Sequence, residues 1–405
     1  MISLDDALAH VLERVAPLAP VEVSVAAAAG TVLAEDVVAA HPVPPFANSA
    51  MDGVAVRAAD TGPGARLRLV GTVAAGAPAS HPVVVGEAMR IMTGAPMPAG
   101  ADAIVMVELC EFEGDEWVTV AEAVPDGNHV RPVGDDIAVG AVVLAAGASV
   151  TAGGVALLRT LGRSTVSVVP RPRVGVISTG DELVEPPAEL GAGQIYDSNR
   201  AALLALLDAA GFEPVDMGLV RDDEAAIEAA LLAGVASCDA VVSSGGVSMG
   251  DFDYVKSVLD RVGDMRWMQI AIKPAKPFAF GTIASGGRAV PVFGLPGNPV
   301  SSMVSFELLA RPALRAMAGR ERLRRPVTEV LAIDDFGRRP DGKTHFARVI
   351  VTIDADGRQV ARSAGGQGSH HLAAMALANG LAVLPDGDGV PPGGTLAVLL
   401  LDEVP

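Results

Sequence analysis

The stretch Val174-Gly175-Val176-Ile177-Ser178-Thr179-Gly180-Asp181-Glu182 joins a short apolar run to a loop of small polar and acidic residues. The β-branched run predicts a buried strand. A helix is expected over residues 198–210, and strands then alternate with helices as far as residue 317. This alternation predicts a doubly wound, mostly parallel α/β sheet. Ligands of such sheets bind beyond the carboxyl ends of the strands.

The rest of the chain is richer in strand signals. Residues 41–140 consist of short β-rich pieces separated by Gly, Pro and Asp, which predicts an inserted β-rich domain. Only strand signals follow residue 326, and they predict a C-terminal small β-barrel or sandwich. We therefore expect a multidomain α/β plus β protein with a segmented N-terminal domain (1–40 and 141–170), the inserted domain (41–140), the α/β domain (171–320) and the barrel (321–405).

Composition narrows the possible classes of function. A chain of 405 residues is too long for a single core. Its formal net charge of −18 argues against a general nucleic-acid binder. Cys110 and Cys238 are too few for a disulfide framework, which suits a reducing compartment. We see no signal peptide and no membrane span of about 20 apolar residues. A cytoplasmic protein is expected.

Lysine is scarce, yet two lysines lie close together. The chain has four lysines, and Lys273 and Lys276 share the Pro-rich loop 272–277. Compact ammonium groups act as point charges for small oxyanions. A second loop of Gly, Pro and Asn follows at residues 294–301. Two rigid loops at the ends of apolar runs suggest an anion site, although two solvated lysines between strands remain the simpler alternative.

Two loops of the α/β region have residues that suit phosphate groups. They cover residues 178–182 and 243–248, after the first and third predicted strands. Glycine lets the backbone approach closely, while hydroxyl and N–H groups can donate to phosphate oxygens. Neither loop is a P-loop, and no strand-linked G-x-G-x-x-G is present. Each could also be an ordinary turn.

Acidic residues accompany these loops. Helix capping is a sufficient explanation for Asp197, Asp222 and Asp223. Asp181 and Glu182 lie instead in a strand-end loop, where they would repel a phosphate. A Mg²⁺ ion between carboxylates and phosphate removes this conflict. The spacing of His and Cys predicts neither a structural nor a catalytic zinc site.

The β-rich segment contains three further loops with polar residues, at 48–53, 93–96 and 131–136. The first surrounds one acid with small polar residues, and the third combines Arg131 with Asp135 and Asp136. Any of them could be a simple hairpin connection. Periodicity alone does not distinguish these possibilities.

Taken in order, these loops resemble the molybdopterin molybdotransferase (MoeA) family, which includes the E domain of gephyrin. The resemblance spans almost the whole chain. It is carried by residues 48–53, 90–96, 134–136, 178–183, 194–199, 243–248, 273–277, 294–301, 367–369 and 378–379.

The resemblance implies an elongated molecule whose α/β domain is of the molybdopterin-binding type. It also implies the last step of molybdenum cofactor assembly, in which molybdate enters adenylylated molybdopterin and AMP is released with the help of Mg²⁺. The implied catalytic residues are Asp52, Asp136, Lys273 and Lys276, and the implied Mg²⁺ ligands are Asp181 and Glu182. The implied substrate-binding residues are Thr93, Ser178, Thr179, Gly180, Asp222, Ser244, Gly245, Gly246, Ser248, Asp253, Pro296, Asn298, Pro299, Arg348 and Ser369.

By the same resemblance, the protein is a homodimer in which Asp52 and Asp136 act on the other subunit's α/β domain. Small-molecule substrates and the molybdopterin adenylyltransferase are expected partners, while nucleic acid and membranes are not. The family usually has Asp and Tyr where this chain has Ala47 and Val54. Three alternatives stay open at this point: tungstate insertion, molybdopterin adenylylation, and a role as a dimeric scaffold.

Overall fold

The structure, a computed structural model, describes residues 1–245, 254–402 and 404. The chain divides into two compact units, one of residues 1–21, 30–32 and 168–405 and the other of residues 22–29 and 33–167. The chain passes between the units near β1 (Val21–Ser24), β2 (Val32–Leu33) and β13 (Thr165–Val169). The finer division into four domains stays a prediction.

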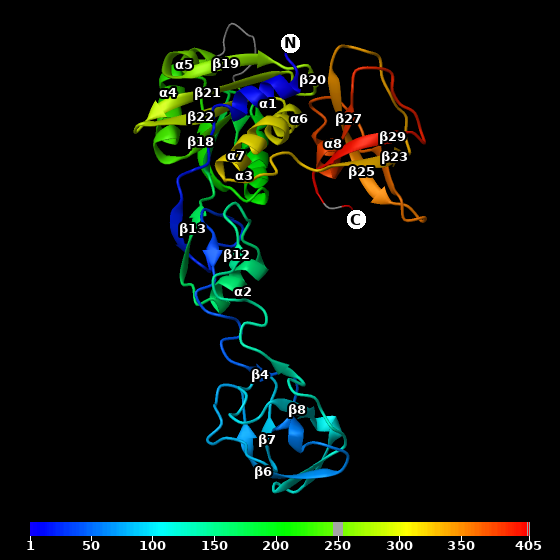
Figure 1. Cartoon of the computed structure of the whole chain (residues 1–405). Coiled ribbons are helices and arrows are strands. Elements are labelled where there is room, and N and C mark those ends of the chain that lie inside the picture. Colours follow the sequence, from blue (N-terminus) through cyan, green and yellow to red (C-terminus); the bar gives the residue numbers. More distant parts are fainter. Residues whose placement is uncertain (246–253, 403, 405) are drawn as a thin grey trace. The chain divides into compact units, whose positions relative to one another are not determined.

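The larger unit contains the predicted α/β sheet (Figure 1). Its six strands have the order β17-β14-β18-β22-β21-β19. β17 (Glu213–Val220), β14 (Arg173–Thr179), β18 (Ala240–Ser244) and β22 (Arg288–Leu295) are parallel, whereas β21 (Pro277–Ser285) and β19 (Asp264–Gln269) form an antiparallel edge. The predicted mostly parallel, doubly wound sheet is confirmed.

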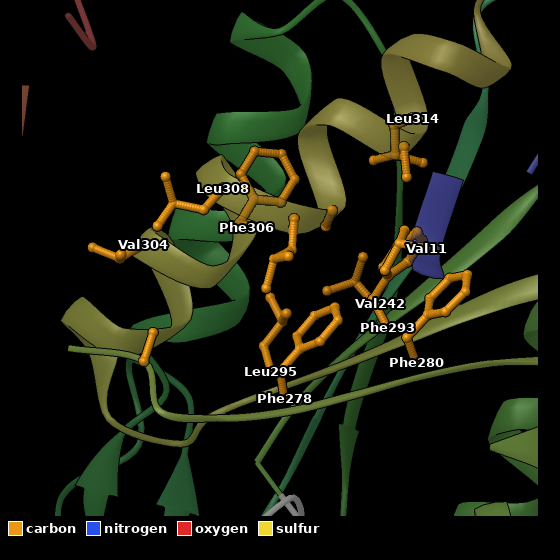
Figure 2. Close-up of a cluster of buried hydrophobic side chains, with 14 of the residues drawn as sticks. Val11, Val242, Phe278, Phe280, Phe293, Leu295, Val304, Phe306, Leu308 and Leu314 are labelled. Carbon is orange, nitrogen blue, oxygen red and sulfur yellow. The ribbon is translucent and has the colours of Figure 1, made fainter. Parts of the chain in front are cut away.

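Helices cover both faces of this sheet because successive strand residues point to opposite sides. Val176 belongs to a core shared with α1 (Leu4–Leu12), α3 (Asn199–Ala209), α6 (Pro299–Ser305) and α7 (Arg311–Met317) (Figure 2). The next residue, Ile177, belongs to the opposite core with α4 (Glu224–Ser237) and α5 (Tyr254–Val262).

The N-terminal helix α1 lies within the α/β body. Ser3 caps it, with its Oγ accepting a hydrogen bond from the Asp6 N–H at 3.0 Å. Ala7, Leu8 and Val11 form the buried stripe that joins the core around α7. The sequence-based division instead grouped these residues with residues 141–170. An amphipathic stripe shows that a helix packs against something, but it does not show against which part of the chain.

The helix predicted over residues 301–317 is continuous but irregular. A π-helical turn, Phe306–Ala310, lies between α6 and α7. It places Glu307 in a buried position, where Arg325 donates two hydrogen bonds to its carboxylate.

The C-terminal residues form the predicted small barrel. β25 (Thr344–Ile353), β26 (Gln359–Ser363), β23 (Val327–Ala332), β29 (Thr395–Leu400) and β27 (Gly380–Leu384) are paired in this order, and β27 closes the ring by pairing with β25. A short helix, α8 (Leu372–Leu377), was not expected. The hairpin-like pair β24 (Phe336–Gly337) and β28 (Gly389–Val390) lies outside the ring.

The barrel is attached to the α/β body through backbone pairing. β20 (Ile272–Lys273) pairs in parallel with β25, so that Lys273 is opposite His345. Phe346 and Leu399 of the barrel also join the core around α6 and α7. The lysine loop is therefore held between the sheet and the barrel.

The smaller unit is rich in strands, as predicted. Its six-stranded sheet has the order β8 (Ala103–Met106), β5 (Gly53–Val56), β7 (Glu87–Ile91), β6 (Ala65–Val73), β10 (Trp117–Val120) and β9 (Cys110–Glu113). Separate apolar clusters cover the two faces of this sheet. The unit also contains β3 (Val37–Val38), β4 (Asn48–Ser49), β11 (Val130–Arg131), β12 (Val142–Leu144) and α2 (Ala152–Thr160). Over the described ranges of both units, we find no helix long and apolar enough to span a membrane.

Candidate active site

The loops predicted to bind phosphate meet at the carboxyl edge of the parallel strands. Gly180 donates its N–H to the Val220 carbonyl at 3.3 Å, and Gly245 donates to the Leu295 carbonyl at 3.1 Å. The first bond joins the ends of β14 and β17, and the second joins the ends of β18 and β22. The predicted residues Ser178, Thr179, Gly180, Ser244, Gly245, Pro296, Asn298 and Pro299 lie at or directly after these ends.

Gly245 shows why a glycine is needed at this edge. Its φ is +97°, and an added Cβ would lie 3.0 Å from the Thr179 carbonyl oxygen. The N–H groups of Gly180 and Gly245 already bind strand carbonyls. Among the described residues, the hydroxyl side chains of Thr179 and Ser244 are candidate donors for a phosphate at this edge.

Asn199 holds two of these loops together, and the sequence reasoning gave it no role of its own. Its Nδ2 donates to Ser244 Oγ at 2.8 Å and to the Gly297 carbonyl at 2.7 Å, which links two of the loops. Its Oδ1 is buried and has no hydrogen-bond partner in the described structure. Its place in the stretch 194–199, which carries the family resemblance, and at the first position of a helix were its sequence signals.

The acidic residues also lie at this edge. The N–H groups of Asp181 and Asp222 each donate to the other residue's carboxylate, at 3.4 and 3.3 Å. Burial, and then the negative charges of Asp181 and Glu182, raise the pKa of Asp222. Asp222 therefore belongs to this acidic group and does not cap α4, whose N-cap is Asp223.

The donor set suits Mg²⁺, which prefers carboxylate oxygens and keeps several water or phosphate ligands. In the described part of the chain, no three His, Cys, Asp or Glu side chains are arranged to hold a metal ion by themselves. Gly246, Ser248 and Asp253 lie outside the described residues.

We expect Asp222→Asn to raise the melting temperature at pH 7 in the absence of divalent cations, by up to about 1 °C, because it removes an exposed like-charge contact. The raised pKa means that ionising Asp222 disfavours the folded state, so the gain should vanish as the pH falls below the carboxyl's ordinary range. Scanning calorimetry at pH 7 and pH 3.5 tests this. A variant that is less stable than the wild type at pH 7 would contradict it.

The two predicted lysines line one cavity of about 260 Å³. Four segments contribute to it: residues 272–277, Ser301 on α6, Lys343 directly before β25, and Gln367-Gly368-Ser369 of the barrel. The N–H of Val300 donates to the Ser369 carbonyl at 3.2 Å, which joins α6 to the barrel loop. None of the described residues that line this cavity is acidic. It is a local region of positive charge in an acidic protein.

Arg348 lies beside this cavity and is only 1% exposed. Its guanidinium donates to the carbonyls of Phe346, Gly366 and Gly368 at 3.1–3.3 Å, and the described residues provide no ion-pair partner for it. Burial lowers the pKa of Arg348. Because carbonyls position this charge without neutralising it, it can favour a nearby anion. Arg348 lines a second cavity of about 370 Å³, which shares Lys273, Gln367 and Gly368 with the first.

Three of the predicted site residues, Asp52, Thr93 and Asp136, lie in the smaller unit. Asp52 Oδ1 accepts hydrogen bonds from the Thr93 N–H at 2.6 Å and from Thr93 Oγ1 at 2.9 Å. These bonds lower the pKa of Asp52, the backbone bond most strongly. Asp136 lies in another loop, where its N–H donates to the Val43 carbonyl. Val54 is fully buried in the sheet. The replacement of the usual Tyr by Val at this position therefore affects the packing of the sheet.

Comparison with known proteins identifies the family. The molybdopterin molybdenumtransferase of Haemophilus influenzae is 38% identical over 401 residues, which cover 98% of each chain. This chain belongs to the MoeA family. Family models match residues 2–162 (MoeA N-terminal region, domains I and II), 175–316 (probable molybdopterin binding domain) and 337–401 (MoeA C-terminal region, domain IV).

Other MoeA relatives support the assignment. The molybdopterin molybdenumtransferase of Bacillus subtilis is 34% identical over 381 residues, or 92% of this chain and 87% of the relative. The crystal structure of the MoeA protein from Pyrococcus horikoshii OT3 has a TM-score of 0.80 and 29% identity, and the match covers 99% of this chain and all of that one. The predicted family, its fold and its activity, molybdenum insertion in molybdenum cofactor biosynthesis, are confirmed.

Proposed function

We propose that this MoeA protein inserts molybdate into adenylylated molybdopterin with release of AMP, and that molybdate binds in the 260 Å³ cavity. The observation that carries this proposal is the convergence of Lys273, Lys276 and Ser369 on one cavity with no acidic lining among its described residues. Ammonium groups and a hydroxyl are suitable donors for a small dianion. The charge of the nearby Arg348 has the same effect.

Molybdate insertion forms two Mo–S bonds and breaks one Mo–O bond, while molybdenum stays at oxidation state +6. The two thiol protons of the dithiol leave with the released oxygen as water, so the step balances without a redox partner. The lysines hold the dianion next to the incoming sulfurs and offset its repulsion of thiolates. Positioning and charge stabilisation of this kind need no covalent enzyme intermediate.

The nucleotide end of the substrate is assigned to the carboxyl edge of the sheet. The hydroxyls of Ser244 and Thr179 offer donors for the pyrophosphate, with Ser244 held in place by Asn199. Asp181 and Glu182 would hold Mg²⁺ there together with phosphate oxygens. When bound, Mg²⁺ would neutralise phosphate charge and assist cleavage of the P–O bond. Water then supplies the oxygen and protons that separate AMP from molybdopterin.

A direct assay tests the function. Purified protein is incubated with adenylylated molybdopterin, and AMP is quantified by chromatography with molybdate and Mg²⁺ each present or absent. We expect rapid AMP release only when both are present. Equal release without molybdate would mean that cleavage is not coupled to insertion, and release driven by tungstate alone would identify the other oxyanion as the substrate.

The remaining expectations from the family resemblance are kept as proposals. The protein forms a homodimer in which Asp52 and Asp136 of one subunit act with the α/β domain of the other, and the molybdopterin adenylyltransferase delivers the substrate. Sedimentation at the monomer mass would contradict the dimer. A cytoplasmic location follows from the place of the family in cofactor biosynthesis, and cell fractionation tests it.

A further inference from the structure

A third lysine lies at the proposed molybdate cavity. The chain has four lysines, and Lys273, Lys276 and Lys343 all line the 260 Å³ cavity. The fourth, Lys256, is on α5, where it pairs with Asp260 at 3.1 Å. In a chain that otherwise uses arginine for its positive charge, three lysines at one cavity indicate a shared task.

Backbone contacts bring Lys343 to this position. The N–H of the next residue, Thr344, donates to the Ala271 carbonyl at 2.9 Å, and Thr344 pairs with Ile272 in the β20–β25 register. Lys343 is thus attached to the same strand pair that carries Lys273. Because these are backbone bonds, substitution of the Lys343 side chain leaves them intact.

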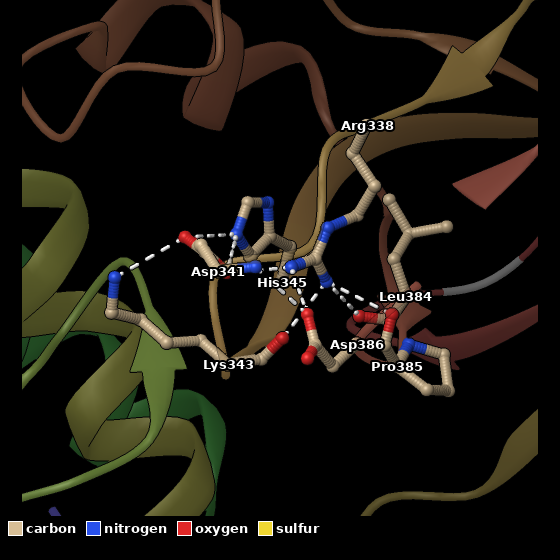
Figure 3. A network of polar contacts seen from close by, with 7 residues as sticks. All are labelled: Arg338, Asp341, Lys343, His345, Leu384, Pro385 and Asp386. Atoms are coloured by element: carbon tan, nitrogen blue, oxygen red, sulfur yellow. Dashed lines mark hydrogen bonds and ion pairs between the residues drawn. The ribbon is translucent and has the colours of Figure 1, made fainter. Parts of the chain in front are cut away.

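A network of charged side chains holds the ammonium group of Lys343 in position (Figure 3). Asp341 Oδ2 accepts a hydrogen bond from Lys343 Nζ at 3.2 Å. Asp341 is held in turn by His345 Nε2, at 3.1 and 3.2 Å, and by Arg338 Nη2 at 2.6 Å. These partners, with His345 making the largest contribution, lower the pKa of Asp341 to about 2.

Arg338 binds the backbone carbonyls of the segments next to this network. Its side chain is 6% exposed, and its Nη1 donates to the carbonyls of Lys343, Leu384 and Pro385 at 2.8–3.0 Å. Its Nη2 also reaches Asp386 at 3.1 Å. A buried guanidinium thus holds both the main chain of Lys343 and the carboxylate that contacts its ammonium group.

We propose that Lys343 is a third substrate-binding ammonium group of the molybdate cavity and that Asp341 is its positioning residue. Lys343 lines the cavity, whereas Asp341 is not among the described residues that line it. An ammonium group already held by its neighbours loses less side-chain freedom when the anion binds. The inference rests on the proposed function, since it takes molybdate as the occupant.

Molybdate binding to the purified full-length protein, measured by isothermal titration calorimetry, tests the proposal. We expect Lys343→Met to weaken binding roughly ten- to hundredfold, the loss typical of one charge-assisted contact. Asp341→Asn should weaken it by a smaller factor, about two- to fivefold, because the ammonium group stays but is less well held. Lys256→Met, the matched lysine outside the cavity, should bind like the wild type.

Three outcomes separate the hypotheses. If Lys276→Met loses binding while Lys343→Met binds like the wild type, Lys343 is not a ligand and this inference fails alone. If the wild type binds no molybdate, or if the Lys273, Lys276 and Lys343 variants all bind normally, the proposed cavity itself is wrong. Lys343→Arg provides a further check, because it should restore most of the binding if charge is what matters. Melting temperatures unchanged by these exposed substitutions confirm that each variant is folded.

Discussion

Lys276→Met is expected to lower molybdate-dependent AMP release by about a hundredfold or more, while the protein keeps its wild-type stability. Lys276 is exposed and lines the cavity, so the substitution removes a positive charge but almost no buried contact. Loss of one preorganised donor to a developing or bound oxyanion costs about two to three orders of magnitude in rate. Exposed substitutions of this kind change stability by no more than about 0.5 kcal/mol.

The measurement is a comparison of kcat and KM for molybdate with the midpoint of urea unfolding in the same variant. Lys276→Arg separates charge from shape, since a guanidinium keeps the charge but cannot occupy the same compact position. We expect it to retain part of the activity. Equal losses of activity and stability in Lys276→Met would show that the lysine has a structural role instead.

Arg325→Met is expected to lower the free energy of unfolding of the larger unit by about 3 kcal/mol, the typical result of removing one partner from a buried ion pair. Arg325 donates to both carboxylate oxygens of Glu307, at 2.8 and 3.0 Å, and also to the Leu401 carbonyl. The Glu307 side chain is 1% exposed. Its other guanidinium neighbour, Arg311, is 3.7 Å away and cannot replace the lost bonds.

Each unit contains one of the two tryptophans, so fluorescence can follow the unfolding of the larger unit by itself. Trp117 lies in the smaller unit and Trp267 in the larger, so a Trp117→Phe background leaves fluorescence that reports on the larger unit alone. Arg324→Met is the matched control, because the ion pair that Arg324 makes with Asp5 in the described structure is exposed, and its loss should cost less than about 1 kcal/mol. Similar losses in both variants would rule out a special role for the buried pair. Adding Glu307→Gln to Arg325→Met should recover part of the loss.

Local patterns predicted much of the fold correctly. The apolar run before Ser178 predicted a buried strand, and the alternation of strands with helices predicted the parallel sheet. Helix α8 was missed because six residues between strand signals fall below the length at which periodicity is informative. The π turn at Phe306 was also beyond prediction, since it depends on the contact between Glu307 and a residue 18 positions later.

Some residues of the site were also indicated by local sequence, whereas others were identified only from the structure. The scarcity of lysine, together with the short spacing between Lys273 and Lys276, predicted an anion site at these two residues, and the structure places both at one cavity. Lys343 carried the same compositional signal but no neighbouring lysine, and only the strand pairing places it at the cavity. Asn199 belongs to a stretch that resembles the family but had no assigned role, and its two bonds to separate loops are visible only in three dimensions.

By itself, the sequence determined the parallel sheet and the strand-end loops, because each depends on residues within a few positions of one another. It also determined the family, because the matching motifs are distributed over almost the whole chain. Only the tertiary structure decided which residues share a cavity, how Arg348 remains charged without an acidic neighbour, and which core receives α1. These features depend on pairing and packing between segments up to about 300 residues apart, and no local pattern encodes the partner of such a contact.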